Sequence, residues 1–127
     1  MRGLLDTSVF IAGEQGRQLR KDQLPTEAAV SVVTLAELEL GVHMALTDDV
    51  RSRRLRTLKA LQTTYVPLAV DETVASAFAE LVATARRAGH RPKLQDTWIA
   101  ATARAHDIAV YTQDADFDQL AVEVVRV

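Results

Sequence analysis

The chain has no cysteine among its 127 residues, which excludes a disulfide framework and thiolate metal sites. No stretch rich in proline, glycine or serine divides it, so we expect one domain spanning residues 1–127. Long hydrophobic runs are absent as well. The short apolar stretch near Met1 is interrupted by Asp6, and no longer one follows. This pattern predicts neither a signal peptide nor a membrane span, and together with the lack of cysteine it indicates a cytoplasmic protein.

An excess of basic charge is also missing. The 15 Lys and Arg residues are outnumbered by 17 Asp and Glu residues, giving a net charge of -2 and a pI of about 5.9. Proteins that hold nucleic acid by overall charge are basic, so any contact with nucleic acid must be local. The content of 48% hydrophobic and 25% charged residues is that of an ordinary globular protein.

Several catalytic and cofactor motifs do not occur. The sequence contains no GxSxG, no phosphate-binding glycine-rich loop and no GxGxxG, which excludes serine hydrolase, P-loop and Rossmann cofactor functions. The three histidines, His43, His90 and His106, share no metal-ligand spacing.

Short apolar runs alternate with helical patterns, which predicts an α/β fold. We expect strands at 4–5, 28–33, 65–70, 108–111 and 122–127, and helices at 7–13, 34–46, 50–61, 72–88 and 97–107. Thr34 and Glu37 have the spacing of a capping box at the start of the second helix. Strands in this arrangement form a central, mostly parallel sheet of four to five strands with both faces covered.

Five acidic residues lie where predicted strands give way to turns or helices: Asp6, Glu37, Asp96, Asp114 and Asp116. The exits of parallel strands meet at one edge of a sheet, so these carboxylates can converge there. Taken singly, each has a simpler interpretation, because Asp favours helix N-caps and turns and Glu completes capping boxes. The joint pattern favours a cluster.

A carboxylate cluster requires a cation, because like charges oppose one another's ionisation. All the candidate ligands are oxygen atoms, which favours Mg²⁺ or Mn²⁺, as one or two ions, over zinc. A metal held in this way binds a phosphate oxygen and activates water for in-line attack. The sequence therefore predicts cleavage of phosphodiester bonds.

Four segments carry a family resemblance: LLDTSVF, SVVTLAELELG, QDTWIAATA and YTQDADFDQL. In this order they resemble the signatures of PIN-domain nucleases over nearly the whole chain, and the small format is most similar to the VapC toxins of bacterial toxin–antitoxin (VapBC) pairs. The resemblance implies a three-layer α/β/α sandwich and a metal-dependent endoribonuclease. It also implies an RNA substrate, a VapB-like protein antitoxin, a toxin–antitoxin hetero-oligomer and a toxin homodimer.

The resemblance also implies roles for the acids. Asp6, Glu37, Asp96 and Asp114 would be catalytic metal ligands, and Asp116 would support the metal. Many relatives have Asn at the first acidic position of the last motif, so the relative weight of Asp114 and Asp116 stays open.

Other residues leave alternatives open. Glu39 rivals Glu37, because the helical wheel does not separate them. Hydroxyl groups at Thr112, and at Thr7 or Ser8, are suited to orient the carboxylates, although capping explains them equally well.

Two further sets of residues point outward. Leu40 and Met44 lie off the apolar stripe of their helix and are candidates for contact with a partner. A basic group precedes Asp96 and could guide a phosphate backbone to the metal; it consists of Arg86, Arg87, Arg91 and Lys93.

Two other functions fit parts of the pattern. A Mg²⁺-dependent phosphoaccepting signalling domain has this size and class, but it needs an acidic pair after the first strand, where only Asp6 stands. A nuclease-like fold kept as a catalytically silent binding module would be favoured by the loss of a ligand, and all five acids are present.

Overall fold

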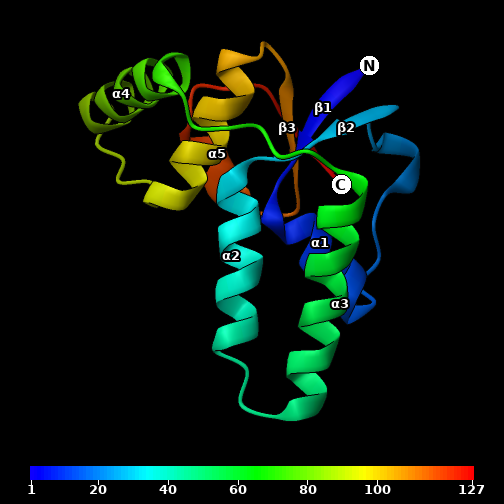
Figure 1. Ribbon diagram of the computed structural model, residues 1–127. Coiled ribbons are helices and arrows are strands. Elements are labelled where there is room, and N and C mark those ends of the chain that lie inside the picture. Colours follow the sequence, from blue (N-terminus) through cyan, green and yellow to red (C-terminus); the bar gives the residue numbers. More distant parts are fainter.

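The computed structural model describes all 127 residues and combines strands with helices, four of which follow one another between the second and the third strand (Figure 1). The strands are β1 (Arg2–Leu5), β2 (Glu27–Ala29), β3 (Ala109–Thr112) and β4 (Val124–Arg126). The helices are α1 (Thr7–Gln15), α2 (Val32–His43), α3 (Asp48–Thr64), α4 (Glu72–Arg87) and α5 (Leu94–Ala105). Two short 3₁₀ turns, η1 (Lys21–Gln23) and η2 (Ala115–Gln119), complete the chain.

The strands form one parallel sheet in the order β2-β1-β3-β4. Leu4 of β1 lies between Ala29 of β2 and Val110 of β3, so β1 and β3 are central. The carboxyl ends of both central strands therefore reach the same edge of the sheet, and Asp6 follows β1 directly.

Alternation along the strands divides the core into two parts. Leu4 and Val110 point to a cluster that includes residues of α4, α5 and η2, whereas Leu5 and Tyr111 point to a cluster formed with α1, α2 and α3. Helices thus cover both faces, which confirms the predicted α/β/α sandwich with a parallel sheet of four strands.

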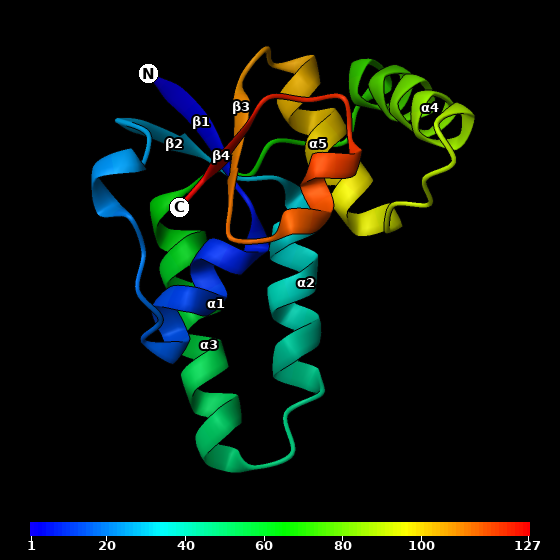
Figure 2. The same ribbon diagram turned by 180° about the vertical axis from the view of Figure 1, so that it is seen from behind.

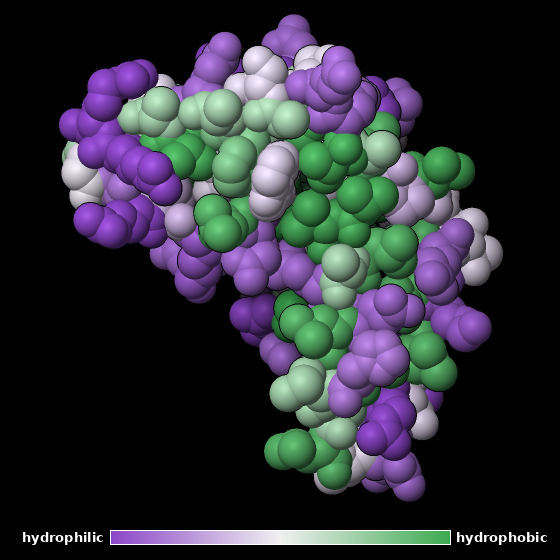
Figure 3. Space-filling view, turned by 60° about the vertical axis from the view of Figure 1, so that its left-hand side comes forward, coloured by the Kyte–Doolittle hydropathy of each residue, from purple (hydrophilic) through white to green (hydrophobic).

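Helices α2 and α3 pack side by side and extend well beyond the sheet as a hairpin (Figures 1 and 2). The space-filling view shows a hollow between this hairpin and the part of the molecule that holds α4 and α5 (Figure 3). Apolar surface continues from one part to the other beside it (Figure 3). No helix of the protein combines the length and the hydrophobicity needed to cross a bilayer.

The predicted start of the second helix is wrong. Strand β2 ends at Ala29, and Ser31 caps α2 by accepting a hydrogen bond from the Val33 amide at 3.0 Å. The β-branched residues Val32 and Val33 suggest a strand by propensity, but the Ser31 cap turns the chain before them. Thr34, the predicted cap, is fully buried inside the helix.

The predicted strand at 65–70 is wrong as well. Only Leu68 pairs, in an isolated parallel bridge with Ser31, through hydrogen bonds with the backbone of Val30 and Val32. Pro67 has no amide hydrogen to donate, and the neighbouring chain turns into α2 at once, so the ladder cannot grow. The remaining predicted elements are present with shifted ends.

Candidate active site

Asp6 is placed by the junction between β1 and α1. It is the N-cap of α1, is only 4% exposed, and its Oδ2 accepts hydrogen bonds from the Ser8 amide at 3.2 Å and from the Thr112 hydroxyl at 2.9 Å. Asp6 therefore does cap a helix, as the simpler interpretation of the sequence has it. The same hydrogen bonds also fix the direction of a buried carboxylate at the edge of the sheet.

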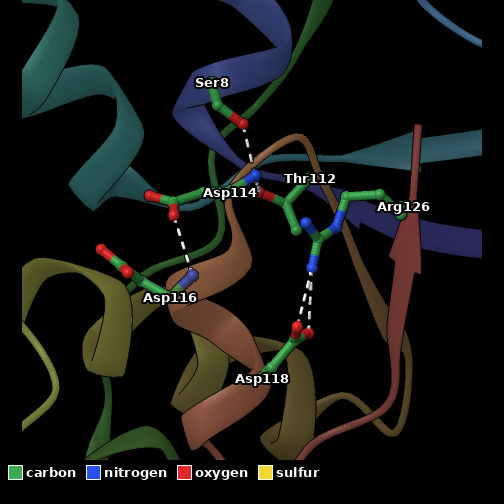
Figure 4. A network of polar contacts seen from close by, with 6 residues as sticks. All are labelled: Ser8, Thr112, Asp114, Asp116, Asp118 and Arg126. Atoms are coloured by element: carbon green, nitrogen blue, oxygen red, sulfur yellow. Dashed lines mark hydrogen bonds and ion pairs between the residues drawn. The ribbon is translucent and has the colours of Figure 1, made fainter.

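Thr112, the fully buried last residue of β3, joins three elements through one hydroxyl group. Because it gives its proton to Asp6, its oxygen is free to accept from the Asp114 amide at 2.9 Å and from the Ser8 hydroxyl at 3.1 Å. The Ser8 oxygen in turn accepts from the Gln113 amide at 3.0 Å. Figure 4 shows how this network ties the start of α1 to the loop that carries Asp114.

Glu37 comes from the second turn of α2, not from the first turn as predicted, because the helix begins at Val32. Its Oε1 accepts a hydrogen bond from the Thr7 hydroxyl at 2.7 Å, and that hydroxyl lies 3.0 Å from the Thr34 hydroxyl. Burial raises the pKa of Glu37, against the Thr7 hydrogen bond, and the charge of Asp6 raises it further. Glu39 is exposed, so the helix turns Glu37 and not Glu39 to the site.

Asp96 lies in the first turn of α5, which begins at Leu94 and not after Asp96 as predicted, and it is 8% exposed. Its Oδ2 is buried and has no hydrogen-bond partner. Burial, together with the charges of Asp6, Asp114 and Glu37, raises the pKa of Asp96 to about 7. A buried carboxylate oxygen without a donor is costly unless a cation or a proton satisfies it.

Asp114 and Asp116 complete the cluster from the start of η2. Asp114 caps η2 by accepting from the Asp116 amide at 2.8 Å, and the two side chains lie next to each other (Figure 4). Carboxylate oxygens of Asp96, Asp114 and Asp116 lie within 4.8 Å of one another. The structure therefore brings both members of the last motif into reach of one ion.

The side chain of Lys93 places one positive charge beside the acidic cluster. The Lys93 ammonium lies 3.4 Å from Asp116 Oδ2, and this hydrogen-bonded pair, with the charges of Asp96 and Asp114, raises the pKa of Lys93. The sequence indicates that Lys93 lies near Asp96, because only two residues separate them. Nothing in the sequence predicts the contact of Lys93 with Asp116. Gln95, which also lines the cavity, is not indicated by the sequence either.

These side chains surround a cavity of about 310 Å³, lined mainly by Asp6, Thr7, Ser8, Glu37, Lys93, Gln95, Asp96 and Asp114. Four predicted acids thus share one cavity, and Asp116 joins it through Asp96 and Asp114. The donor set consists of carboxylate oxygens with one oxygen unsatisfied, which fits a hard divalent cation.

Known proteins show the same fold and motifs. Residues 3–123 match the PIN domain. The chain is 45% identical to Ribonuclease VapC5 of Mycobacterium tuberculosis over 98% of this chain and 95% of that protein. It is 46% identical to Ribonuclease VapC4 of the same organism over 99% and 97%.

Solved structures of toxin–antitoxin proteins share the fold of this chain. VapBC-5 from Mycobacterium tuberculosis, described as a member of the VapBC family of toxin–antitoxin systems, superposes with a TM-score of 0.91 at 42% identity, covering 99% of this chain and 98% of that one. A toxin–antitoxin complex from Klebsiella pneumoniae superposes with a TM-score of 0.70 at 26% identity, covering 97% and 95%. The chain therefore belongs to the PIN-domain family, as its four sequence motifs predict, and within that family it groups with the VapC ribonucleases.

Proposed function

We propose that this protein is an endoribonuclease toxin that hydrolyses phosphodiester bonds in RNA with the help of Mg²⁺ or Mn²⁺ and is neutralised by an antitoxin. The main support is the buried Asp96 Oδ2, which has no hydrogen-bond partner and lies among carboxylates from separate elements. The chain is also 45% identical to a ribonuclease. A site with this much negative charge does not attract RNA unless a cation neutralises it.

Each acid has a role in this proposal. Asp6, Glu37, Asp96 and Asp114 would hold the ion directly or through water, with Asp116 in support. The carboxylate oxygens of Asp96, Asp114 and Asp116 lie within 4.8 Å of one another. When bound, the ion supplies charge stabilisation for the phosphate and lowers the pKa of a water molecule. The roles of Asp114 as a catalytic ligand and of Asp116 in support stay predictions.

The remaining residues position the acids. Thr112 and the Ser8 amide hold Asp6, and Thr7 holds Glu37, so both carboxylates keep their direction without a ligand. Lys93 neutralises Asp116 in the free protein and can bind a phosphate oxygen when RNA enters the site. This scheme uses no protein nucleophile, and the reaction is a direct hydrolysis.

The proposed antitoxin is a VapB-like protein, in line with the toxin–antitoxin complexes that share this fold. Leu40 and Met44 of α2 are 60% and 66% exposed, and both line an apolar hollow that reaches Glu37 and Gln95. Their exposure supports the prediction that they contact a partner. The toxin homodimer and the cytoplasmic location stay predictions.

The test is cleavage of a mixed cellular RNA pool by purified, antitoxin-free protein. Cutting should require Mg²⁺ or Mn²⁺, stop with EDTA, and fall by orders of magnitude in Asp96→Asn. Glu39→Gln is the matched control, because it removes an exposed carboxylate of α2 and should leave cutting unchanged. A folded wild type that cuts no RNA with either metal would overturn catalysis in favour of a binding module.

A further inference from the structure

A second, larger cavity lies beside the acidic one. It has a volume of about 550 Å³ and lies where the end of α4 leads into α5, lined by Val82, Arg86, Gly89, His90, Arg91, Pro92 and Leu94. Its size is within the range of about 300–1,000 Å³ that is usual for ligand sites. No acidic residue lines it.

The cations of this cavity have no partners in the protein. Neither Arg86 nor Arg91 forms an ion pair or a side-chain hydrogen bond, unlike Arg51, Arg104 and Arg126. Exposed arginines of α3 such as Arg53 are unpaired too, so the distinctive feature here is that the cations line one hollow without a carboxylate. Two unpaired guanidinium groups and an imidazole around one hollow form a site for an anion, since guanidinium groups bind phosphate with paired hydrogen bonds.

The two cavities share a wall. Arg91, Pro92 and Leu94 line the basic one, while Lys93, Gln95 and Asp96 line the acidic one. Lys93, the residue before α5, has an extended backbone (φ -62°, ψ 142°), and it lines the acidic cavity and not the basic one. Arg91 lies two residues before Lys93, at most about 7 Å away along the chain. The Lys93 ammonium lies 3.4 Å from Asp116 Oδ2, so the basic cavity lies close to the acidic cluster.

We propose that this basic pocket, which rests on the proposed ribonuclease function, is the subsite for a nucleotide next to the bond that is cut. Arg86 and Arg91 bind its phosphate, and His90 and Pro92 contact its base, as imidazole rings and apolar side chains do with unstacked bases of single-stranded RNA. The pocket therefore adds RNA affinity beside the cleavage site that depends little on the identity of the base.

The test compares two double variants with the same loss of charge. Arg86→Ala/Arg91→Ala empties the pocket of its cations, and Arg53→Ala/Lys59→Ala removes two exposed cations of α3. Binding of a short fluorescent single-stranded RNA is measured by anisotropy in the Asp96→Asn background, where no cutting occurs, at several salt concentrations. Circular dichroism and thermal unfolding check that both variants fold.

The pocket variant should bind RNA several-fold more weakly, and its dependence of log K on log salt should flatten by about 0.7 for each lost phosphate contact. In the active enzyme its KM should rise several-fold with little change in kcat, and Mn²⁺ affinity should not change. The α3 variant should behave like the parent protein in all three measurements.

Three outcomes would overturn the subsite. Equal weakening in both double variants would mean that only overall charge matters. Wild-type RNA affinity and KM in the pocket variant, with the wild type cutting RNA, would reject the subsite and leave the ribonuclease function intact. Altered self-association of the pocket variant, seen by size-exclusion chromatography with RNA binding intact, would make the pocket a contact between copies of the chain.

Discussion

Asp96 links the chemistry of the site to the stability of the protein. Burial and the charges of Asp6, Asp114 and Glu37 raise its pKa from 3.8 to about 7. Between these values the folded protein keeps a proton that the unfolded chain has released, so the folded state becomes less favoured as pH rises through this window. In the absence of metal, Asp96 therefore costs stability at and above neutral pH, and this cost is absent below about pH 4.

Asp96→Asn should raise the free energy of unfolding of the metal-free protein by about 1 to 3 kcal/mol at pH 8, because one pKa unit corresponds to about 1.4 kcal/mol. The gain should be smaller at pH 5. Thermal unfolding in EDTA at both pH values measures it, with Glu39→Gln as a control that should change neither. An Asp96→Asn variant less stable than the wild type at pH 8 would contradict the stability cost assigned to ionised Asp96.

Lys93 should act on the two ligands of the site in opposite directions. Its charge opposes a second cation near Asp96 and Asp116 and attracts a phosphate. Lys93→Met should bind Mn²⁺ a few-fold more tightly in calorimetric titrations without RNA, and bind RNA a few-fold more weakly. Lys93→Arg keeps the charge and should resemble the wild type in both. A change of the same sign for both ligands would contradict this role.

At the scale of elements, the sequence correctly predicts which segments bring their acids together. It predicts the first residues of the helices less well. Asp6 and Asp114 do follow central strands, as their position after apolar runs indicates. Glu37 and Asp96 reach the same cavity from helices, because α2 begins at Val32 and α5 begins at Leu94. Local propensity at 30–33 favours a strand, and only the Ser31 cap and the pairing of neighbouring segments decide otherwise.

Thr112 joins the end of β3 to the starts of α1 and η2. Its hydrogen bond to Asp6 confirms the prediction that this hydroxyl orients a carboxylate, although the sequence does not indicate which one. Thr112→Val removes the donor to Asp6 and the acceptor for the Asp114 amide, leaving buried polar groups unpaired at a cost of about 1 to 3 kcal/mol. RNA cutting should fall with it, since Asp6 loses its direction. Thr112→Ser keeps the hydroxyl and should recover most of both losses, measured by urea unfolding and by cleavage rate. Equal losses in the two variants would assign the effect to the missing methyl group.

For the whole molecule, the acidic site is where the layers are joined. Its carboxylates come from the β1–α1 junction, α2, α5 and the turn after β3, so an ion bound among them would connect helices from both faces of the sheet. The sequence predicts this convergence because strand exits share an edge, whereas the charge balance set by Lys93 depends on the folded chain alone.

A ligand that binds only the folded protein adds RT ln(1 + [L]/Kd) to its stability, or about 2.7 kcal/mol at a hundredfold excess over Kd. For a domain of this size, Mn²⁺ or Mg²⁺ at that excess should raise the melting temperature by roughly 10 °C, measured by thermal unfolding against EDTA. Asp96→Asn should lose most of this rise even though its metal-free form melts higher at pH 8. Glu39→Gln should keep the full rise, because Glu39 lies outside the cavity. A metal-induced rise of the same size in Asp96→Asn would place the ion elsewhere on the protein.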